Sequence, residues 1–139
     1  MTVRDFTSAD EKRLVEAAKA VRANAYAAYS GYRVGSALLD DQGRIHTGCN
    51  VENASFPLGA CAEANAIGAM VAAGGKRIVA IAAVGGRDQL DACTPCGGCR
   101  QNIREFSNEA TRVILLDAKG AVTTCGIDEL LPLSFHFPA

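Results

Sequence analysis

Three cysteines in two short motifs place the strongest constraint on what this chain can fold into. They lie in Cys61-Ala62-Glu63 and, further along, in Pro95-Cys96-Gly97-Gly98-Cys99. Three thiolates can hold a tetrahedral zinc ion and leave its fourth position open, which distinguishes a catalytic zinc site from a closed structural one. Glu63 follows the first cysteine closely enough to reach a metal-bound water without binding the metal itself. The pattern favours metal-assisted hydrolysis in a fold that brings both motifs together.

Each part of this pattern has an alternative interpretation. A Cys-x-x-Cys pair alone is as typical of a redox dithiol or of half a structural zinc site. Glu63 alone is typical of a solvated acidic residue in the first turn of a helix. Cys93 is an alternative fourth ligand, although Pro95 makes its spacing to the next cysteine tight. The two remaining cysteines, Cys49 and Cys125, are expected to pack as small apolar residues in strands.

Length and charge restrict the class of protein. A chain of 139 residues corresponds to one domain, residues 1–139. Fourteen basic residues against fifteen acidic ones give a formal net charge of -1. A nucleic-acid-binding protein would need a basic face, so we expect a small-molecule ligand and no nucleic-acid partner.

The sequence also predicts a cytoplasmic protein without a membrane partner. No stretch approaches the ~20 apolar residues of a membrane span. The first ten residues lack the apolar core of an export signal, so reduced thiols are expected, some of them on metal.

The hydrophobic pattern predicts an alternating order of helices and strands. Helices are expected over residues 8–26, 61–73, 96–106 and 127–131, and strands over 34–39, 44–49, 77–84, 111–116 and 122–125. Ser8 is the expected N-cap of the first helix, in a capping box with Glu11. The order predicts an α/β fold, a three-layer α/β/α sandwich around a mixed sheet of about five strands, in which helix-separated strands run parallel.

Both cysteine motifs fall at expected helix starts, which addresses an electrostatic problem. Zinc with three thiolates carries a net charge of -1, and water activation requires the pKa of the bound water to fall towards about 7. Helix N-termini offer free N–H groups and partial positive charge to the sulfur atoms. Gly97 and Gly98 let backbone amides approach closely. Glu63 could then carry a proton from water to substrate.

The ordered motifs resemble the zinc deaminase superfamily, most closely its small, homotetrameric, three-cysteine cytidine deaminases. A cysteine or histidine ligand, a glutamate two residues later and Pro-Cys-x-x-Cys are the marker of the class. Further matches cover nearly the whole chain: Tyr29-Ser30, Val34-Gly35, Gly43-Arg44-Ile45, residues 48–54, Pro57-Leu58-Gly59, Arg100-Gln101 and residues 129–132. The resemblance implies hydrolysis of cytidine and deoxycytidine to uridine and deoxyuridine in pyrimidine salvage, with release of ammonia. In that reaction a zinc-bound water attacks C4.

The resemblance also implies roles for individual residues. Cys61, Cys96 and Cys99 would bind one zinc ion per chain, and Glu63 would be the proton shuttle. Asn50 and Glu52 would hold the ribose hydroxyls. Alternate residues of an extended segment point the same way, so both can reach one sugar. A base without its sugar would leave these polar groups unpaired and be rejected.

The remaining substrate-binding candidates are one backbone group and three aromatic side chains. The Ala62 N–H is expected at the pyrimidine carbonyl. Tyr32, Phe56 and Phe135 are expected to wall the base and sugar, although each aromatic alone is more typical of a core. In a homotetramer, neighbouring subunits would complete each pocket through the Leu58-Gly59 loop and the C-terminal phenylalanine.

Two departures from the family pattern stand out. Many three-cysteine relatives carry an arginine directly after the catalytic glutamate, where it offsets the thiolate charge; this chain has Ala64. We expect compensation from N–H groups of Asn65, from the two helix dipoles or from Arg100. The segment Phe135-His136-Phe137 also lacks the glycine that often follows the first phenylalanine.

Three other functions compete with nucleoside deamination. A deaminase of a cytosine-nucleoside antibiotic such as blasticidin S is the nearest, and the segment from Asn50 to Ala54 favours a plain ribose instead. A nucleic-acid editor would need a basic surface, which the net charge disfavours. A non-catalytic zinc module would bind metal without turnover, and the presence of Glu63 disfavours it.

Overall fold

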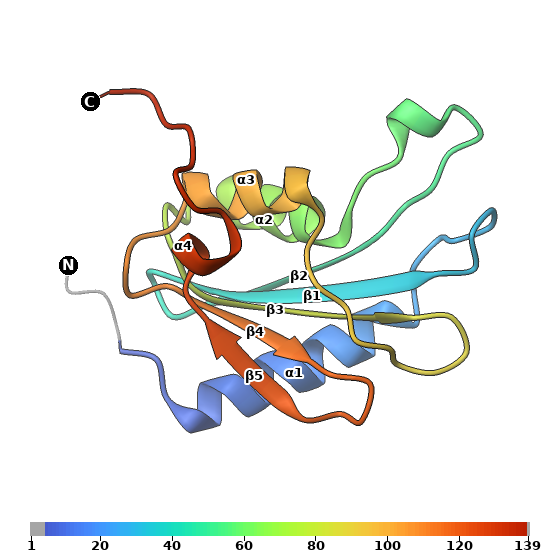
Figure 1. The fold of residues 1–139 in the computed structure, drawn as a ribbon, viewed down its shortest axis with the longest axis horizontal. Helices are drawn as coiled ribbons and strands as arrows, with labels where there is room; N and C mark the ends of the chain where they lie inside the picture. Colours follow the sequence, from blue (N-terminus) through green and yellow to red (C-terminus); the bar gives the residue numbers. More distant parts are fainter. Residues whose placement is uncertain (1–4, 139) are drawn as a thin grey trace.

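A mixed sheet of five strands lies between two layers of helices in the computed structural model, which describes residues 5–138 (Figure 1). The strands are β1 (Arg33–Asp40), β2 (Ile45–Cys49), β3 (Ile78–Gly86), β4 (Arg112–Leu116) and β5 (Val122–Cys125). The helices are α1 (Ser8–Arg22), α2 (Ala62–Ala72), α3 (Gly97–Glu105) and α4 (Ile127–Leu130), with a 3₁₀ turn η1 (Phe56–Leu58). The predicted three-layer α/β fold is confirmed. Within residues 5–138, none of the helices has the length and apolar character to span a bilayer.

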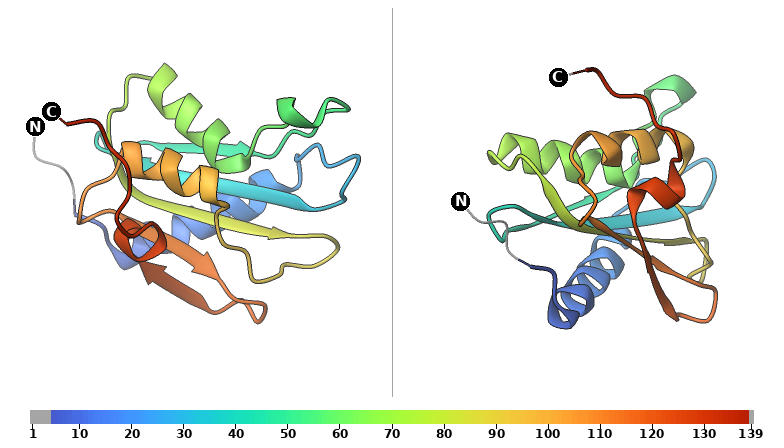
Figure 2. Two further views of the ribbon diagram at one scale, coloured as in Figure 1. Left: turned by 45° about the horizontal axis from the view of Figure 1, so that its top comes forward. Right: turned by 60° about the vertical axis from the view of Figure 1, so that its left-hand side comes forward.

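The sheet has the order β2-β1-β3-β4-β5. Strand β1 is antiparallel to both of its neighbours, so β2 and β3 run parallel to each other with α2 connecting them. Strands β3 and β4 pair in parallel across α3, and β5 returns antiparallel. Helix α1 covers one face, while α2, α3 and α4 lie on the other (Figure 1, Figure 2). The expected parallel relation of the helix-separated strands is confirmed.

Two hydrophobic cores, one on each face of the sheet, hold the layers together. On one face, Leu14 and Ala18 of α1 pack against Leu39 and Ala82. On the other, Met70 of α2 packs with alternate strand residues and with α3 and α4; that core comprises Leu38, Ala66, Ile67, Met70, Ile78, Ile81, Ile103, Val113 and Ile127. Every residue of β3 is buried, as a central strand covered on both faces requires.

The first helix differs from its prediction at both ends. Its capping box is Thr7 with Asp10, one residue earlier than predicted. The helix ends at Arg22 instead of residue 26, because the Tyr26 N–H donates to the carbonyl of Asn50, 3.0 Å away, and leaves the helical path. The other predicted elements begin and end within two residues of the observed ones.

Gly48 of β2 determines how closely α2 lies on the sheet. A Cβ atom at this position would come within 2.4 Å of the Ala66 nitrogen and 2.5 Å of the Ala62 oxygen, both backbone atoms of α2. Glycine is therefore required for this close approach of helix and strand. The first turn of α2, which follows Cys61 and contains Glu63, is fixed relative to the sheet by this contact.

Candidate active site

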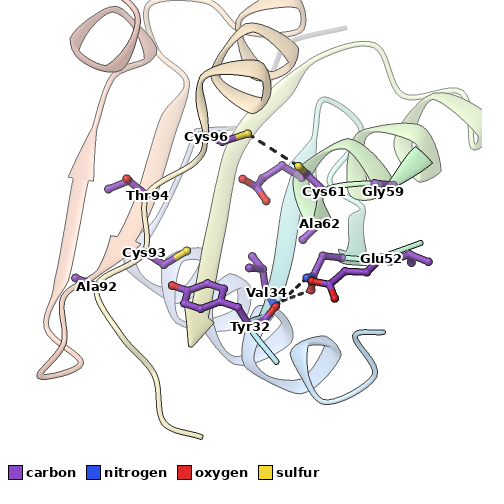
Figure 3. Close-up of a pocket in the computed structure, with 14 residues that line it drawn as sticks. Tyr32, Val34, Glu52, Gly59, Cys61, Ala62, Ala92, Cys93, Thr94 and Cys96 are labelled. Carbon is purple, nitrogen blue, oxygen red and sulfur yellow. Dashed lines mark hydrogen bonds between the residues drawn. The ribbon is translucent and has the colours of Figure 1, made fainter. Parts of the chain in front are cut away.

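The three predicted zinc-binding cysteines lie at the starts of two helices, as the sequence indicated. Cys61 is the N-cap residue of α2, Cys96 is the N-cap residue of α3, and Cys99 lies in the first turn of α3. Their sulfur atoms all lie within 4.8 Å of one another, and the Sγ atoms of Cys61 and Cys96 are 3.9 Å apart (Figure 3). A tetrahedral zinc with sulfur ligands at about 2.3 Å requires sulfur–sulfur distances of about 3.8 Å. The cluster therefore fits zinc.

The helix starts supply the nearest compensation for thiolate charge. The backbone N–H of Cys99 donates to the Cys96 Sγ at 3.5 Å, and this hydrogen bond lowers the pKa of Cys96. Arg100, by contrast, donates to the carbonyls of Pro95 and Leu130, both at 2.9 Å. Among the compensators considered from the sequence, the structure favours the N-terminus of α3, with Arg100 bracing the backbone before Cys96.

Asn65 has a structural contact instead of a contact with sulfur. Its side-chain amide donates to the carbonyl of Cys49 at 2.8 Å and so ties α2 to the end of β2. Together with Gly48, this contact fixes the first turn of the helix against the sheet.

Glu63 is buried beside the sulfur cluster. Its side chain belongs to the first turn of α2, and the residue is 4 % exposed. Burial raises the pKa of its carboxyl group. A carboxyl group with a raised pKa is suited to accept and return a proton near neutral pH.

One cavity joins the cysteine motifs to the predicted sugar-binding residues. It has a volume of about 520 Å³, and its wall includes Cys61, Ala62, Glu63 and Cys96 together with Asn50, Glu52 and Tyr32 (Figure 3). Val34, Val51, Gly59, Ala60, Ala92, Cys93 and Thr94 complete it. Segments far apart in the sequence therefore meet around one space large enough for a small molecule.

Asn50 and Glu52 lie in an extended segment, as predicted, and both face this cavity. Backbone hydrogen bonds to Tyr26 and Ala60 hold residues 50–52 in place. The Asn50 side chain accepts from the Val34 N–H at 2.8 Å and donates to the Tyr32 carbonyl at 2.9 Å. Both side chains are thus oriented by the chain itself.

The partners of Glu52 come from a turn that sequence reasoning did not assign to the site. The carboxylate accepts from the N–H groups of Tyr29 and Ser30 and from the Ser30 hydroxyl. The Tyr29-Ser30 match to the family was the available sign that this turn belongs to the site. These hydrogen bonds lower the pKa of Glu52, and the one from the Ser30 hydroxyl has the largest effect.

Tyr32 and Cys93 form another part of the cavity wall. The Tyr32 hydroxyl and the Cys93 thiol lie next to each other (Figure 3). Burial and then the neighbouring thiol raise the pKa of Tyr32 to about 12, so its hydroxyl stays protonated. Among residues 5–138 the sulfur cluster contains Cys61, Cys96 and Cys99, and Cys93 lies outside it.

The two cysteines outside the site lie at strand ends. Cys49 ends β2 and Cys125 ends β5, and both are half-buried. Cys125 packs against the core beneath α2 and α3, in agreement with its predicted packing role.

Phe56 and Phe135 lie outside the lining of this cavity in the single chain. Phe56, in η1, is 77 % exposed, and its ring lies edge-on to that of Tyr29 with 6.2 Å between the ring centroids. Phe135 is 67 % exposed, and its ring lies edge-on to that of Phe137 with 5.4 Å between the ring centroids. A substrate contact by either ring stays a prediction.

Residues 8–116 match the family model described as the cytidine and deoxycytidylate deaminase zinc-binding region. The chain belongs to this family. It is 38% identical over 126 residues to a cytidine deaminase of Sporosarcina psychrophila, covering 91% of each chain. It is 46% identical over 113 residues to a cytidine deaminase of Mycobacterium tuberculosis, covering 81% of this chain and 80% of the relative.

The fold matches solved members of the same family. The crystal structure of a cytidine deaminase from Burkholderia pseudomallei superposes with a TM-score of 0.82 at 41% sequence identity, over 94% of this chain and all of that one. Family membership and the cysteine cluster together identify the chain as a zinc-dependent deaminase with one zinc per chain. The alternative of a non-catalytic zinc module is thereby excluded.

Proposed function

We propose that this deaminase converts cytidine and deoxycytidine to uridine and deoxyuridine. A C4–O bond to the oxygen of water forms, the C4–N bond breaks, and the amino nitrogen leaves as ammonia. The observation that carries the proposal is the single cavity, which has the sulfur cluster and Glu63 on its wall together with Asn50 and Glu52. Hydrolytic groups and sugar-binding groups then act on one nucleoside.

Cys61, Cys96 and Cys99 would hold the zinc ion. Bound there, zinc would act as a Lewis acid and lower the pKa of a water molecule to about 7. Three protein ligands are typical of a catalytic zinc site, in contrast to the four of a structural one. The Cys99 N–H at the start of α3, which donates to the Cys96 Sγ, would offset part of the thiolate charge at a site that has Ala64 and no arginine after Glu63.

Glu63 would move the protons. Its carboxylate accepts a proton from the attacking water and passes it to the pyrimidine, and a second transfer completes the departing ammonia. Burial raises the pKa of this carboxyl, which makes its carboxylate a stronger base towards the proton of water. The geometry supports this role because Glu63 lines the cavity beside the sulfur cluster.

The base and the sugar would be held by different elements. The Ala62 N–H, at the start of α2, has no partner within the helix and is free to donate to the pyrimidine carbonyl. Tyr32 would pack against the base as a neutral wall. Asn50 and Glu52 would bind the sugar: the carboxylate accepts from a hydroxyl, and the amide has one N–H left to donate.

Neighbouring subunits of a homotetramer would complete the pocket. Phe56 and Leu58, which precede the cavity residue Gly59, are 77% and 69% exposed, and Phe135 near the C-terminus is 67% exposed. Exposed large apolar side chains are typical of interaction surfaces. A second copy of the chain packed here would bury them and bring aromatic rings to the site. Free thiols at the metal positions also suit a reducing compartment, which supports a cytoplasmic location.

Replacing Glu63 with glutamine tests the chemistry most directly. Glu63→Gln keeps the size of the side chain and removes its proton transfer, so kcat for cytidine should fall by about 10²- to 10⁴-fold while zinc per chain is unchanged. Glu105→Gln, at an exposed position of α3, is the matched control and should retain full activity. Loss of ultraviolet absorbance with cytidine, deoxycytidine, cytosine and blasticidin S gives the rates.

The possible outcomes of this experiment test separate parts of the proposal. Full activity in Glu63→Gln would overturn the proton-shuttle role. Turnover of cytosine as fast as cytidine would remove the sugar-binding role of Asn50 and Glu52. Turnover of blasticidin S in preference to the nucleosides would establish the antibiotic deaminase as the correct function.

A further inference from the structure

The Glu52 carboxylate is held by three donors from one short turn. Its Oε1 atom accepts the N–H groups of Tyr29 at 2.9 Å and Ser30 at 3.0 Å, and its Oε2 atom accepts the Ser30 hydroxyl. The two backbone donors are available whatever the side chain at position 30. Of the three hydrogen bonds to the carboxylate, only the one from the hydroxyl depends on which residue occupies position 30.

The Ser30 hydroxyl is itself held in one orientation. The Tyr32 N–H donates to its oxygen at 2.9 Å. A serine hydroxyl has one proton to donate, and with this N–H on its lone pair the proton is directed to Glu52. Gly31, at φ +71°, supplies the left-handed backbone that brings the Tyr32 N–H back to Ser30.

Glu52 borders two spaces, so its orientation matters. It lines the main cavity and also a neighbouring one of about 420 Å³, whose wall includes Tyr29, Ser30 and Phe56. The hydrogen bond to Oε2 restrains rotation of the carboxylate about its own axis, which the two bonds to Oε1 leave free. Without it, the carboxylate could turn its second oxygen towards the neighbouring cavity or towards solvent.

We propose that Ser30 is a positioning residue that orients Glu52 towards a sugar hydroxyl and so sets the preference for nucleosides that carry it. This inference rests on the proposed function, in which Glu52 binds the sugar. Because deoxycytidine is a proposed substrate, the relevant group is a hydroxyl that both nucleosides share. The dideoxy analogue 2′,3′-dideoxycytidine, which has no ring hydroxyl, is therefore the reference substrate.

The test compares Ser30→Ala with the parent enzyme on both substrates. For cytidine, kcat/KM should fall about 10-fold, the usual effect of one hydrogen bond to a charged group, almost entirely through KM. For dideoxycytidine, kcat/KM should be unchanged. The ratio of kcat/KM for cytidine to that for dideoxycytidine should therefore fall about 10-fold. Ser30→Thr, which keeps the hydroxyl, should restore most of the ratio. Ser55→Ala, at an exposed serine of the neighbouring loop, should leave it unchanged.

Glu52→Gln separates failure of this inference from failure of the sugar assignment. If Glu52→Gln narrows the ratio and Ser30→Ala does not, the positioning role is wrong and the proposed function stands. If Glu52→Gln leaves the ratio unchanged, the sugar assignment itself is wrong. In the expected case, Ser30→Ala adds nothing in the Glu52→Gln background. Should Ser30→Ala not fold, Ser30→Cys, with a weaker donor of similar size, gives the same comparison.

Discussion

The cysteine corner (Cys61, Cys96 and Cys99) and the sugar-side segment (residues 50–52) line the same cavity but are built differently. Cys61 and Cys96 are exposed side chains at helix starts, and their placement depends on the packing of α2 and α3. Asn50 and Glu52, in contrast, hold the backbone of residues 29–34 through their side chains. The first region can change its chemistry without loss of fold, whereas in the second region binding and folding share the same hydrogen bonds.

The largest expected effect concerns the metal and uses two neighbouring thiols. Cys96→Ala should lower zinc affinity by more than about 100-fold, because loss of an outer hydrogen-bond partner alone costs about 10- to 100-fold. Cys93→Ala should keep one zinc per chain, since Cys93 lies beside Tyr32 and outside the sulfur cluster. Zinc per chain after dialysis against a chelator is the measurement. Equal loss of metal in both variants would contradict the three-cysteine assignment.

A second prediction compares stability between the two regions. Asn50→Ala should lower the free energy of unfolding by about 1–3 kcal/mol, because the Val34 N–H and the Tyr32 carbonyl lose their partner. Glu63→Gln should change it by less than about 1 kcal/mol, since volume is kept and no backbone group is left unpaired. Urea unfolding curves of the zinc-loaded parent and variants, all at the same protein concentration, give both values. Similar losses in the two variants would remove the distinction between the regions.

The smallest effect is expected from pH. The pKa of Glu52 is lowered, most by the Ser30 hydroxyl, from an ordinary glutamate value of about 4.3, so the carboxylate stays ionised well below neutral pH. The ratio of kcat/KM for cytidine to that for dideoxycytidine should therefore vary by less than about two-fold between pH 7 and about 5. Hydroxyl recognition should be lost only as the pH falls through the lowered pKa. A ratio that declines steadily from pH 7 would contradict this charge state.

Local patterns predicted the parts of this molecule that depend on residue type and spacing. Apolar periodicity placed nine helices and strands within residues 5–138, and the two cysteine motifs with Glu63 indicated the hydrolytic centre. The end of α1 could not be predicted in this way, because a pairing of Tyr26 with Asn50, distant in sequence, decides it. The capping box was ambiguous because Thr7 with Asp10 and Ser8 with Glu11 have the same spacing.

The supporting contacts of the site were harder to predict than its reactive groups. Ser30 and Gly31 read as ordinary turn residues until Glu52 is brought to them by the fold. Arg100 is a cation close in sequence to the cysteines, yet the carbonyls of Pro95 and of the distant Leu130 determine where its guanidinium lies. The proposed roles of Phe56 and Phe135 require a neighbouring subunit, which the sequence of one chain does not describe.

The close contact at Gly48 gives a way to distinguish catalytically active relatives from inactive ones that share the motifs. Cysteine and glutamate motifs can persist in a sequence after catalysis is lost, because they are short. In a homologue with those motifs but a side chain at the position of Gly48, the backbones of α2 and β2 would have to shift relative to each other. Such a shift would change the position of its first cysteine and its glutamate relative to the second cysteine pair. Inspection of one glycine, which does not line the cavity, therefore serves as a screen for catalytic competence among uncharacterised members of the family.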